Sequence, residues 1–175
     1  MENILLMKRT KELEDFSKQQ GFDKTLFLED IAFIEGGTKK EILKKISQAK
    51  NKLTIYKASS EEMLRFVLEK TKVEMVFGME DINIKDSTHY VRGGLDQISS
   101  KITVKQEKTI AFSFNEILNS KNRSRLLARM RLNIKLGRKY KMKTIFSNFT
   151  DSKMEIRSAK DLQSFWKVLE KERLW

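Results

Sequence analysis

Ten basic residues and no acidic residue occupy the segment from Lys121 to Lys143, a pattern suited to binding a polyanion. Residues 1–100 carry 17 Lys and Arg against 17 Asp and Glu, whereas residues 101–175 carry 19 against 7, so the second part supplies the whole formal net charge of +12. Lys and Arg that neutralise phosphates release condensed counterions, which drives nucleic-acid binding. The one-sided block therefore favours RNA or DNA as the partner.

The spacing of residues in this block predicts a helix over roughly 121–141 with two different faces. The arc expected to face the core contains Leu126, Leu127, Met130, Ile134 and Gly137. The cations expected on the solvent face are Arg125, Arg129, Arg131, Lys135, Arg138 and Lys139. Arginine offers phosphate a planar, bidentate fork, so its predominance strengthens the nucleic-acid hypothesis. An ordinary solvated helix face is the alternative explanation.

A second apolar row lies among these cations and consists of Leu132, Leu136 and Tyr140. Its simplest explanation is packing against a neighbouring helix of the same domain. The sharper hypothesis is a contact with a partner protein beside the nucleic-acid surface.

Short apolar runs alternate with amphipathic segments along the chain, and this alternation predicts the elements that position the basic helix. The expected strands are Ile4–Met7, one within Thr25–Ile34, Leu53–Tyr56, Val73–Phe77, a weak one at Thr88–Val91, Thr109–Phe112 and Thr144–Ser147. Alternating β and α units predict a parallel sheet covered by helices. About seven units predict a compact TIM-barrel-like (β/α) barrel, with a doubly wound open sheet as the alternative.

Several kinds of catalytic and metal site are excluded by composition. The chain has no Cys and one His, His89, so thiolate sites and sites with several imidazoles are impossible. No nucleophile elbow, Walker loop or zinc-protease motif is present. We therefore expect no catalytic residue, no metal ligand and no cofactor on this chain, and His89 is more simply structural or in contact with RNA.

The length of the chain predicts one domain spanning residues 1–175. No apolar stretch approaches the length of a membrane span, and the N-terminal apolar run is too short for a signal peptide. The absence of cysteine agrees with a reducing compartment. We expect a cytoplasmic protein without a membrane partner.

The second half of the chain resembles a known family over roughly residues 94–170. The motifs that carry the resemblance are Gly94–Ile98, Ile110–Phe114 with Glu116–Leu118, the Arg-rich run Asn122–Arg131 continuing through Arg138–Tyr140, and Glu155–Leu162. In this order they resemble the archaeal ribonuclease P protein component 3, related to the thirty-kilodalton subunit of the eukaryotic enzyme.

The resemblance implies a TIM-barrel-like fold and a role in a ribonucleoprotein that removes the 5′ leader from precursor tRNA. In that family the catalytic RNA subunit uses Mg²⁺ for the chemistry, and the proteins support the RNA. The implied partners are the catalytic RNA, precursor tRNA, a small subunit of ferredoxin-like fold, often in a heterotetramer, and other ribonuclease P proteins. The implied RNA contacts are Arg123, Arg125, Arg129, Arg131, Arg138 and Lys139, followed by Arg157 and Lys160 at the start of the last helix.

Two other classes of function stay open at this point. A general RNA-binding or ribosome-associated protein would share the salt-dependent binding without preferring one RNA. A stand-alone barrel enzyme acting on a phosphorylated small molecule would need a pocket with perturbed acids or bases, for which the sequence offers no obvious set.

Overall fold

The structure is a computed structural model that describes residues 1–82, 86 and 92–171. The described strands are β1 (Glu2–Ile4), β2 (Lys24–Leu26), β3 (Ile31–Glu35), β4 (Leu53–Lys57), β5 (Met75–Phe77), β6 (Thr109–Ser113) and β7 (Lys143–Ser147). The described α-helices are α1 (Lys11–Gln19), α2 (Lys39–Gln48), α3 (Glu61–Lys70), α4 (Gln97–Lys105), α5 (Phe114–Asn119), α6 (Arg123–Tyr140) and α7 (Ala159–Glu170). Two short 3₁₀ helices, η1 (Met79–Asp81) and η2 (Lys153–Glu155), follow β5 and β7.

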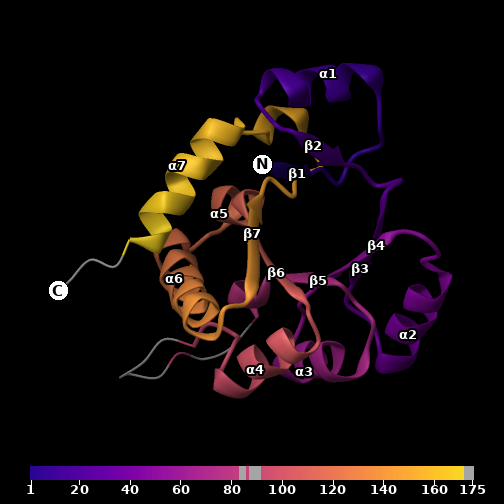
Figure 1. Cartoon of the computed structure of the whole chain (residues 1–175), viewed down its shortest axis with the longest axis vertical. Helices are drawn as coiled ribbons and strands as arrows, with labels where there is room; N and C mark the ends of the chain where they lie inside the picture. The colour runs from indigo at the N-terminus through magenta and orange to yellow at the C-terminus, as the bar shows by residue number, and fades with distance from the viewer. Residues whose placement is uncertain (83–85, 87–91, 172–175) are drawn as a thin grey trace.

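All described strand pairs are parallel, and they form two sheets. One sheet has the order β3-β4-β5-β6-β7, and the other pairs β1 with β2. Just beyond β7 the chain joins the end of β1: Phe149 N–H donates to the Ile4 carbonyl at 2.9 Å, and Leu6 N–H donates to the Thr150 carbonyl at 2.8 Å. The strands therefore follow one another from β3 through β7 to β1 and β2, with the helices around them (Figure 1).

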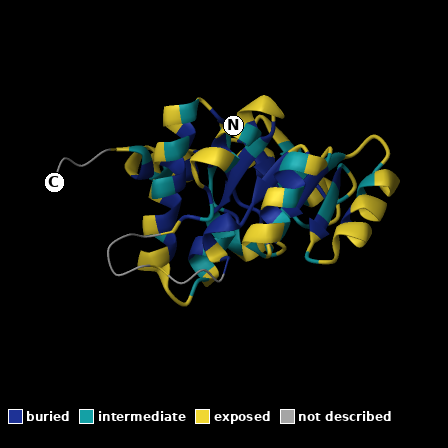
Figure 2. Ribbon diagram, turned by 90° about the horizontal axis from the view of Figure 1, so that it is seen from below, coloured by how far each residue is buried: buried dark blue, intermediate teal, exposed yellow. Residues whose placement is uncertain are grey.

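Alternation of side chains along the strands separates two apolar layers. One layer lies under the helices and includes Ile34, Tyr56 and Phe112. The other layer is an inner cluster to which each described strand contributes: Ile4, Leu26, Ile31, Ile55, Met75, Ala111 and Ile145 belong to it. Strands buried on both faces are expected for a parallel sheet covered by helices, and Figure 2 shows the buried strands between helices with exposed outer faces.

These ladders confirm the α/β class with parallel strands. Among the described residues, no ladder joins β2 to β3, so closure into a barrel stays a prediction. The strand expected within Thr25–Ile34 is in fact two strands, because a turn between Phe27 and Asp30 divides the segment. Asp30 fixes this turn by accepting the Phe27 N–H at 2.9 Å through its Oδ2. The weak strand expected at Thr88–Val91, which includes His89, lies outside the described residues.

Helix starts follow the local sequence closely. Thr38 and Glu41 form a capping box at the start of α2, and Ser158 caps α7 by accepting the Asp161 N–H at 3.1 Å. The helix predicted over roughly 121–141 is confirmed as α6, which Asn122 caps; the short helix α5, capped by Ser113, precedes it and was not predicted. None of the described helices is both long and apolar enough to cross a membrane.

Candidate nucleic-acid interface

Helix α6 carries most of the basic block and is well specified by its own sequence. Leu, Arg, Lys and Met are strong helix formers, and the Asn122 side chain accepts the Arg125 N–H at 3.1 Å to cap the first turn. At 1.5 Å per residue the helix is about 27 Å long. It ends at Lys141, whose left-handed backbone (φ 56°) lets its N–H bond back to the last turn.

The inner face of α6 agrees with the sequence prediction. Leu126, Met130 and Ile134 are buried, and Leu127 is half-buried against the core. Gly137 is also buried, and a Cβ there would lie 3.1 Å from Cγ2 of Thr144, so the glycine lets the helix approach β7 closely. This face anchors α6 and leaves its other sides to carry the cations.

Arg129 is not on the solvent face, which corrects the sequence prediction. Its exposed fraction is 2%, and its Nη1 donates to the carbonyls of Glu80 at 2.9 Å and Ile82 at 3.0 Å. Its Nη2 donates to Oδ1 of Asp86 at 2.9 Å. The guanidinium therefore fastens the segment after β5 to α6, and we remove Arg129 from the set of candidate RNA contacts.

Asn133, one turn further along α6, continues this buried polar contact. Its Nδ2 donates to Oε1 of Glu80 at 2.8 Å and to the Gly93 carbonyl at 2.6 Å. Glu80 is 1% exposed, and burial raises the pKa of its carboxyl from 4.5 to about 8. Glycine is needed at 93, because a Cβ would lie 2.4 Å from Oδ1 of Asn133. This network was not predicted from the sequence. The one indication of it was that Asn133 follows Arg129 by four residues, which places both polar side chains on the same face of α6.

Arg125 lies at the exposed edge of the same network. Its Nε is 2.9 Å from Oδ2 of Asp86, which also accepts the backbone N–H of Arg92 at 3.0 Å through Oδ1. Hydrogen bonds from Arg92 and Arg129 hold the pKa of Asp86 below its usual value. Arg125 stays a candidate contact, held beside a carboxylate of its own chain.

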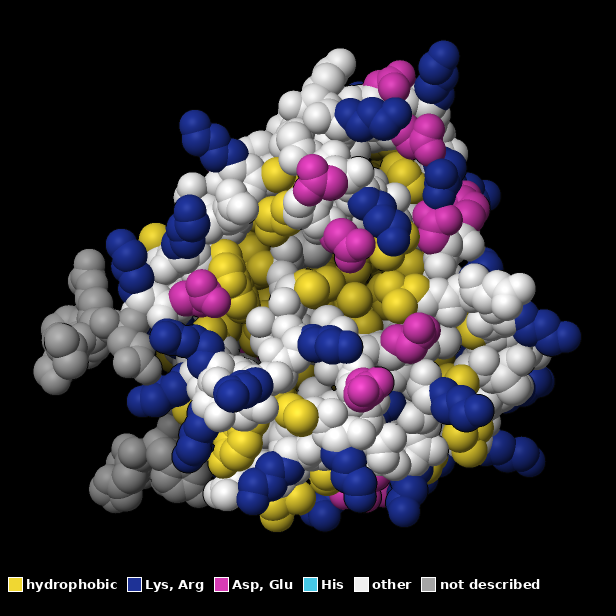
Figure 3. Space-filling view, viewed as in Figure 1, with side chains coloured by type: hydrophobic (Ala, Val, Ile, Leu, Met, Phe, Trp, Pro, Cys, Tyr) yellow, Lys and Arg dark blue, Asp and Glu magenta, His cyan; other side chains and the backbone are white. Residues whose placement is uncertain are grey.

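The other predicted cations on α6 are exposed, and several also hold neighbouring helices. Nε and Nη2 of Arg123 donate to the carbonyls of Ile117 and Leu118 at the end of α5. Arg131 and Arg138 donate to carbonyls at the end of α7. Lys139 places Nζ 5.5 Å from the ring centre of Tyr140. In Figure 3, Lys and Arg gather at the lower left, where Figure 1 places α6.

Arg157 and Lys160 lie at the start of α7, away from the centre of the α6 surface. Arg157 is half-buried, and its Nη1 donates to the Met154 and Ile156 carbonyls at 3.2 and 3.4 Å. Lys160 is exposed beside Gly21 and Gln20. The structure thus brings Arg131, Arg138 and Lys139 together on α6 and sets Arg157 apart.

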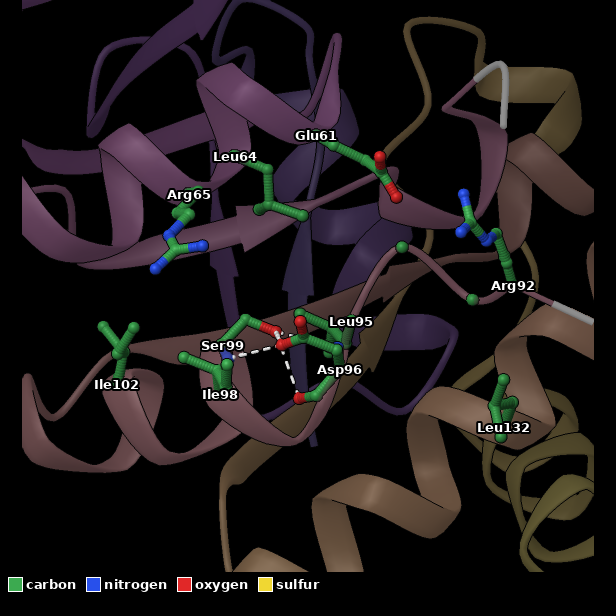
Figure 4. Close-up of a pocket in the computed structure, with 12 residues that line it drawn as sticks. Glu61, Leu64, Arg65, Arg92, Leu95, Asp96, Ile98, Ser99, Ile102 and Leu132 are labelled. Atoms are coloured by element: carbon green, nitrogen blue, oxygen red, sulfur yellow. Dashed lines mark hydrogen bonds between the residues drawn. The ribbon is translucent and has the colours of Figure 1, made fainter. Parts of the chain in front are cut away.

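The second apolar row divides into two parts. Leu136 and Tyr140 pack against the core cluster, as expected for contacts within the domain. Leu132 is half-buried and lines a groove that also contains Leu64, Leu95, Ile98 and Ile102. Figure 4 shows Leu132 on α6 facing this groove between α3, α4 and the segment around Arg92.

Alanine at the two leucines is expected to separate these roles. Leu136→Ala should lower the free energy of unfolding by about 1–3 kcal/mol, because part of a core contact is lost. Leu132→Ala should lower it by less than about 1 kcal/mol, because its side chain lines an open groove. Urea unfolding of both variants measures this difference. Equal losses would place Leu132 in the core as well.

At the carboxyl ends of the strands, a small cluster of charges marks where a barrel enzyme would carry its site. Nζ of Lys57, at the end of β4, lies 3.2 Å from Oε1 of Glu35 and 3.5 Å from Oε1 of Glu116. Burial raises the pKa of Glu116, and the nearby ammonium of Lys57 opposes that rise. Gly78, at φ 73°, has no side chain and so leaves the space in which the side chains of Lys57 and Glu116 meet. This pair holds α5 against the strand ends, and no group of three or more metal-ligating side chains exists in the described part of the chain.

The fold and this surface define an α/β protein of parallel strands with a basic helix exposed along one side. No protein-family model matches the chain, and no curated protein matches it by sequence. A chain in the cryo-EM structure of archaeal ribonuclease P with mature tRNA matches its fold with a TM-score of 0.73 and 17% sequence identity, covering 97% of this chain and 74% of that chain. A crystal structure of an uncharacterized protein matches with a TM-score of 0.47 and 10% identity, over 82% and 38% of the two chains.

Proposed function

We propose that this protein is a subunit of ribonuclease P, the ribonucleoprotein endoribonuclease that removes the 5′ leader from precursor tRNA. The observation that carries the proposal is the likeness of nearly the whole fold to a chain of the archaeal ribonuclease P complex with tRNA. The basic surface of α6 supports it independently, because a protein that assists a catalytic RNA must neutralise phosphates. We also propose that the seven described strands curve into a TIM-barrel-like arrangement, to which each of them contributes inner side chains.

In this proposal the chain binds RNA and the RNA subunit performs the Mg²⁺-dependent cleavage. The proposed RNA contacts are Arg123, Arg125, Arg131, Arg138 and Lys139 on α6, with Arg157 and Lys160 at the start of α7. The proposed protein partners are a small subunit of ferredoxin-like fold, in a heterotetramer, and the other ribonuclease P proteins. The groove lined by Leu132 is the proposed place for one such protein contact. The complex would act in the cytoplasm.

The chain is expected to accelerate cleavage of precursor tRNA by the cognate catalytic RNA when Mg²⁺ is limiting. With the small partner subunit present, we expect an increase of about tenfold, which corresponds to about 1.4 kcal/mol of barrier. The measurement is the initial rate of 5′ leader release with and without the chain. Polylysine of equal total charge serves as the control for simple charge neutralisation.

An equal acceleration by polylysine, or none by the folded chain, would contradict the proposal. If the chain bound many RNAs equally and left cleavage unchanged, a general RNA-binding protein would be the better description.

A further inference from the structure

The cationic surface of α6 continues onto α7, beyond the two contacts, Arg157 and Lys160, predicted at the start of that helix. The side chains of Arg138, Lys167, Glu170 and Lys171 line one shallow hollow between the two helices. Arg131 reaches the same place, because its Nη2 donates to the Lys171 carbonyl at 2.9 Å. Lys135 lies between Arg131 and Arg138 on α6 and is exposed. Three cations and one acidic residue therefore line the hollow, and Arg131 and Lys135 continue the basic surface along α6.

The two arginines in this cluster are held in place by the end of α7. Nη1 of Arg138 donates to the Glu170 carbonyl at 3.0 Å, as Arg131 does to that of Lys171. Cations at a helix C-terminus are favoured by the exposed carbonyls, so these bonds explain the two arginines structurally. Each bond uses one of five guanidinium N–H donors, which leaves donors for phosphate on side chains already fixed in direction.

Lys167 and Lys171 are exposed and line the same hollow as Arg138, and Lys135 is exposed on α6 between Arg131 and Arg138; packing gives no reason for so much like charge. Like charges within a few ångströms repel, and a polyanion on the surface would remove that repulsion. The position of this excess charge, across both helices, indicates a ligand that spans them.

The chemistry of the surface also limits the form of the ligand. The described aromatic residues of the two helices, Tyr140, Phe165 and Trp166, pack against the core. Phe165 and Trp166 contact the ring of Phe146 at centroid distances of 5.9 and 5.6 Å. Proteins that hold single-stranded RNA stack bases on exposed aromatic side chains, whereas double-helical RNA is bound through its backbone and shape. The described surface has cations for a backbone and no outward aromatic platform.

We propose that α6 and α7 together bind the sugar–phosphate backbone of double-helical RNA, with Lys167 and Lys171 contacting phosphates beside Arg131, Lys135 and Arg138. This inference rests on the proposed function and adds α7 to its RNA surface.

The test uses the full chain and a labelled RNA hairpin, with affinity measured over a series of salt concentrations. The double variant Lys167→Gln, Lys171→Gln should bind roughly tenfold more weakly at low salt. The slope of log affinity against log salt should fall by about 0.9 for each lysine that contacts a phosphate, or about 1.8 for both. Adding Lys135→Gln to this double variant should lower the slope by about 0.9 more. The matched control is Lys40→Gln, Lys44→Gln on α2, which lies on the far side of the molecule (Figure 1) and should leave the slope unchanged.

The inference would be overturned if the Lys167, Lys171 variant kept the same slope of log affinity against log salt as the unaltered protein. It would also be overturned if the protein bound a single-stranded RNA more tightly than the hairpin. Thermal unfolding of each variant shows that the fold is intact. Failure of the proposed function would give a different result from failure of this inference. The protein would then bind the hairpin through Lys167 and Lys171 but would not accelerate cleavage of precursor tRNA.

Discussion

Replacing Arg129 with alanine is expected to lower the free energy of unfolding by about 3 kcal/mol or more. The guanidinium is 2% exposed and serves three acceptors: the carbonyls of Glu80 and Ile82 and the carboxylate of Asp86. Removing the donor leaves buried carbonyls without their partner, and each such loss costs about 1–3 kcal/mol. Removing one partner of a buried charge pair has a similarly large effect.

Urea unfolding of Arg129→Ala beside Arg131→Ala measures this effect with a matched control. Arg131 is exposed and makes one bond to a carbonyl, so its loss should cost less than about 1 kcal/mol. Arg129→Lys should restore little of the stability, because an ammonium does not reproduce the planar fork. If Arg129→Ala kept full stability and lost RNA affinity instead, the assignment of Arg129 to the interior would be wrong.

The case of Arg129 shows what helical periodicity predicts and what it misses. The arc of apolar residues correctly identified the face of α6 against the core, because burial of apolar area sets that face. A second face, with Arg129 and Asn133, is buried against η1 and Gly93 through hydrogen bonds. Polar residues on a buried face look like solvent-exposed residues in a sequence, since their partners, Glu80 and Asp86, are more than 40 residues away.

At the level of the fold, the sequence predicted what is local and missed what depends on tertiary contacts. The α/β alternation is confirmed, and local cap residues such as Thr38 and Ser158 stand where α2 and α7 begin. The division of residues 25–34 into β2 and β3 was missed, because its turn at Phe27–Asp30 contains no Gly or Pro and is held by the Asp30 side chain. Helix α5 has six residues, which is too short for a periodic pattern. Lys167 and Lys171 were missed because their place beside Arg138 exists only once α6 and α7 pack together.

Glu80→Gln is expected to make the protein more stable than the unaltered chain at pH 9, by up to about 5 kcal/mol. Burial raises the pKa of Glu80 from 4.5 to about 8, and the nearby carboxylates of Glu116 and Asp81 add to the rise. Because each pKa unit corresponds to about 1.4 kcal/mol, ionising the buried carboxyl is costly. Gln keeps an oxygen to accept the bond from Nδ2 of Asn133 and has no proton to lose in this range.

The direction of the pH dependence follows from which state holds the proton. Between pH 4.5 and 8 the folded protein keeps a proton on Glu80 that the unfolded chain releases, so stability falls as pH rises through this window and levels off above it. Urea unfolding from pH 5 to pH 9 should show this fall in the unaltered protein and a smaller fall in Glu80→Gln. At pH 5 the free energies of unfolding of the two proteins should agree within about 1 kcal/mol. The exposed Glu107→Gln serves as the control and should keep the original profile.

The outcome also decides which carboxyl controls the pH dependence. The pKa of Glu116 is raised by burial too, and Glu116 faces Lys57, Asp81 and Glu35 at the same end of the strands. If the fall in stability with rising pH persisted in Glu80→Gln and disappeared in Glu116→Gln, the pH dependence would belong to the Lys57–Glu116 pair. That result would contradict our assignment of it to Glu80. Loss of the Glu80 proton would leave a buried carboxylate between η1 and α6, and the bond from Nδ2 of Asn133, which favours the ionised form, offsets only part of that burial cost. The attachment of the segment after β5 to α6 should therefore be most stable below pH 8, with the cations of α6 firmly positioned for RNA.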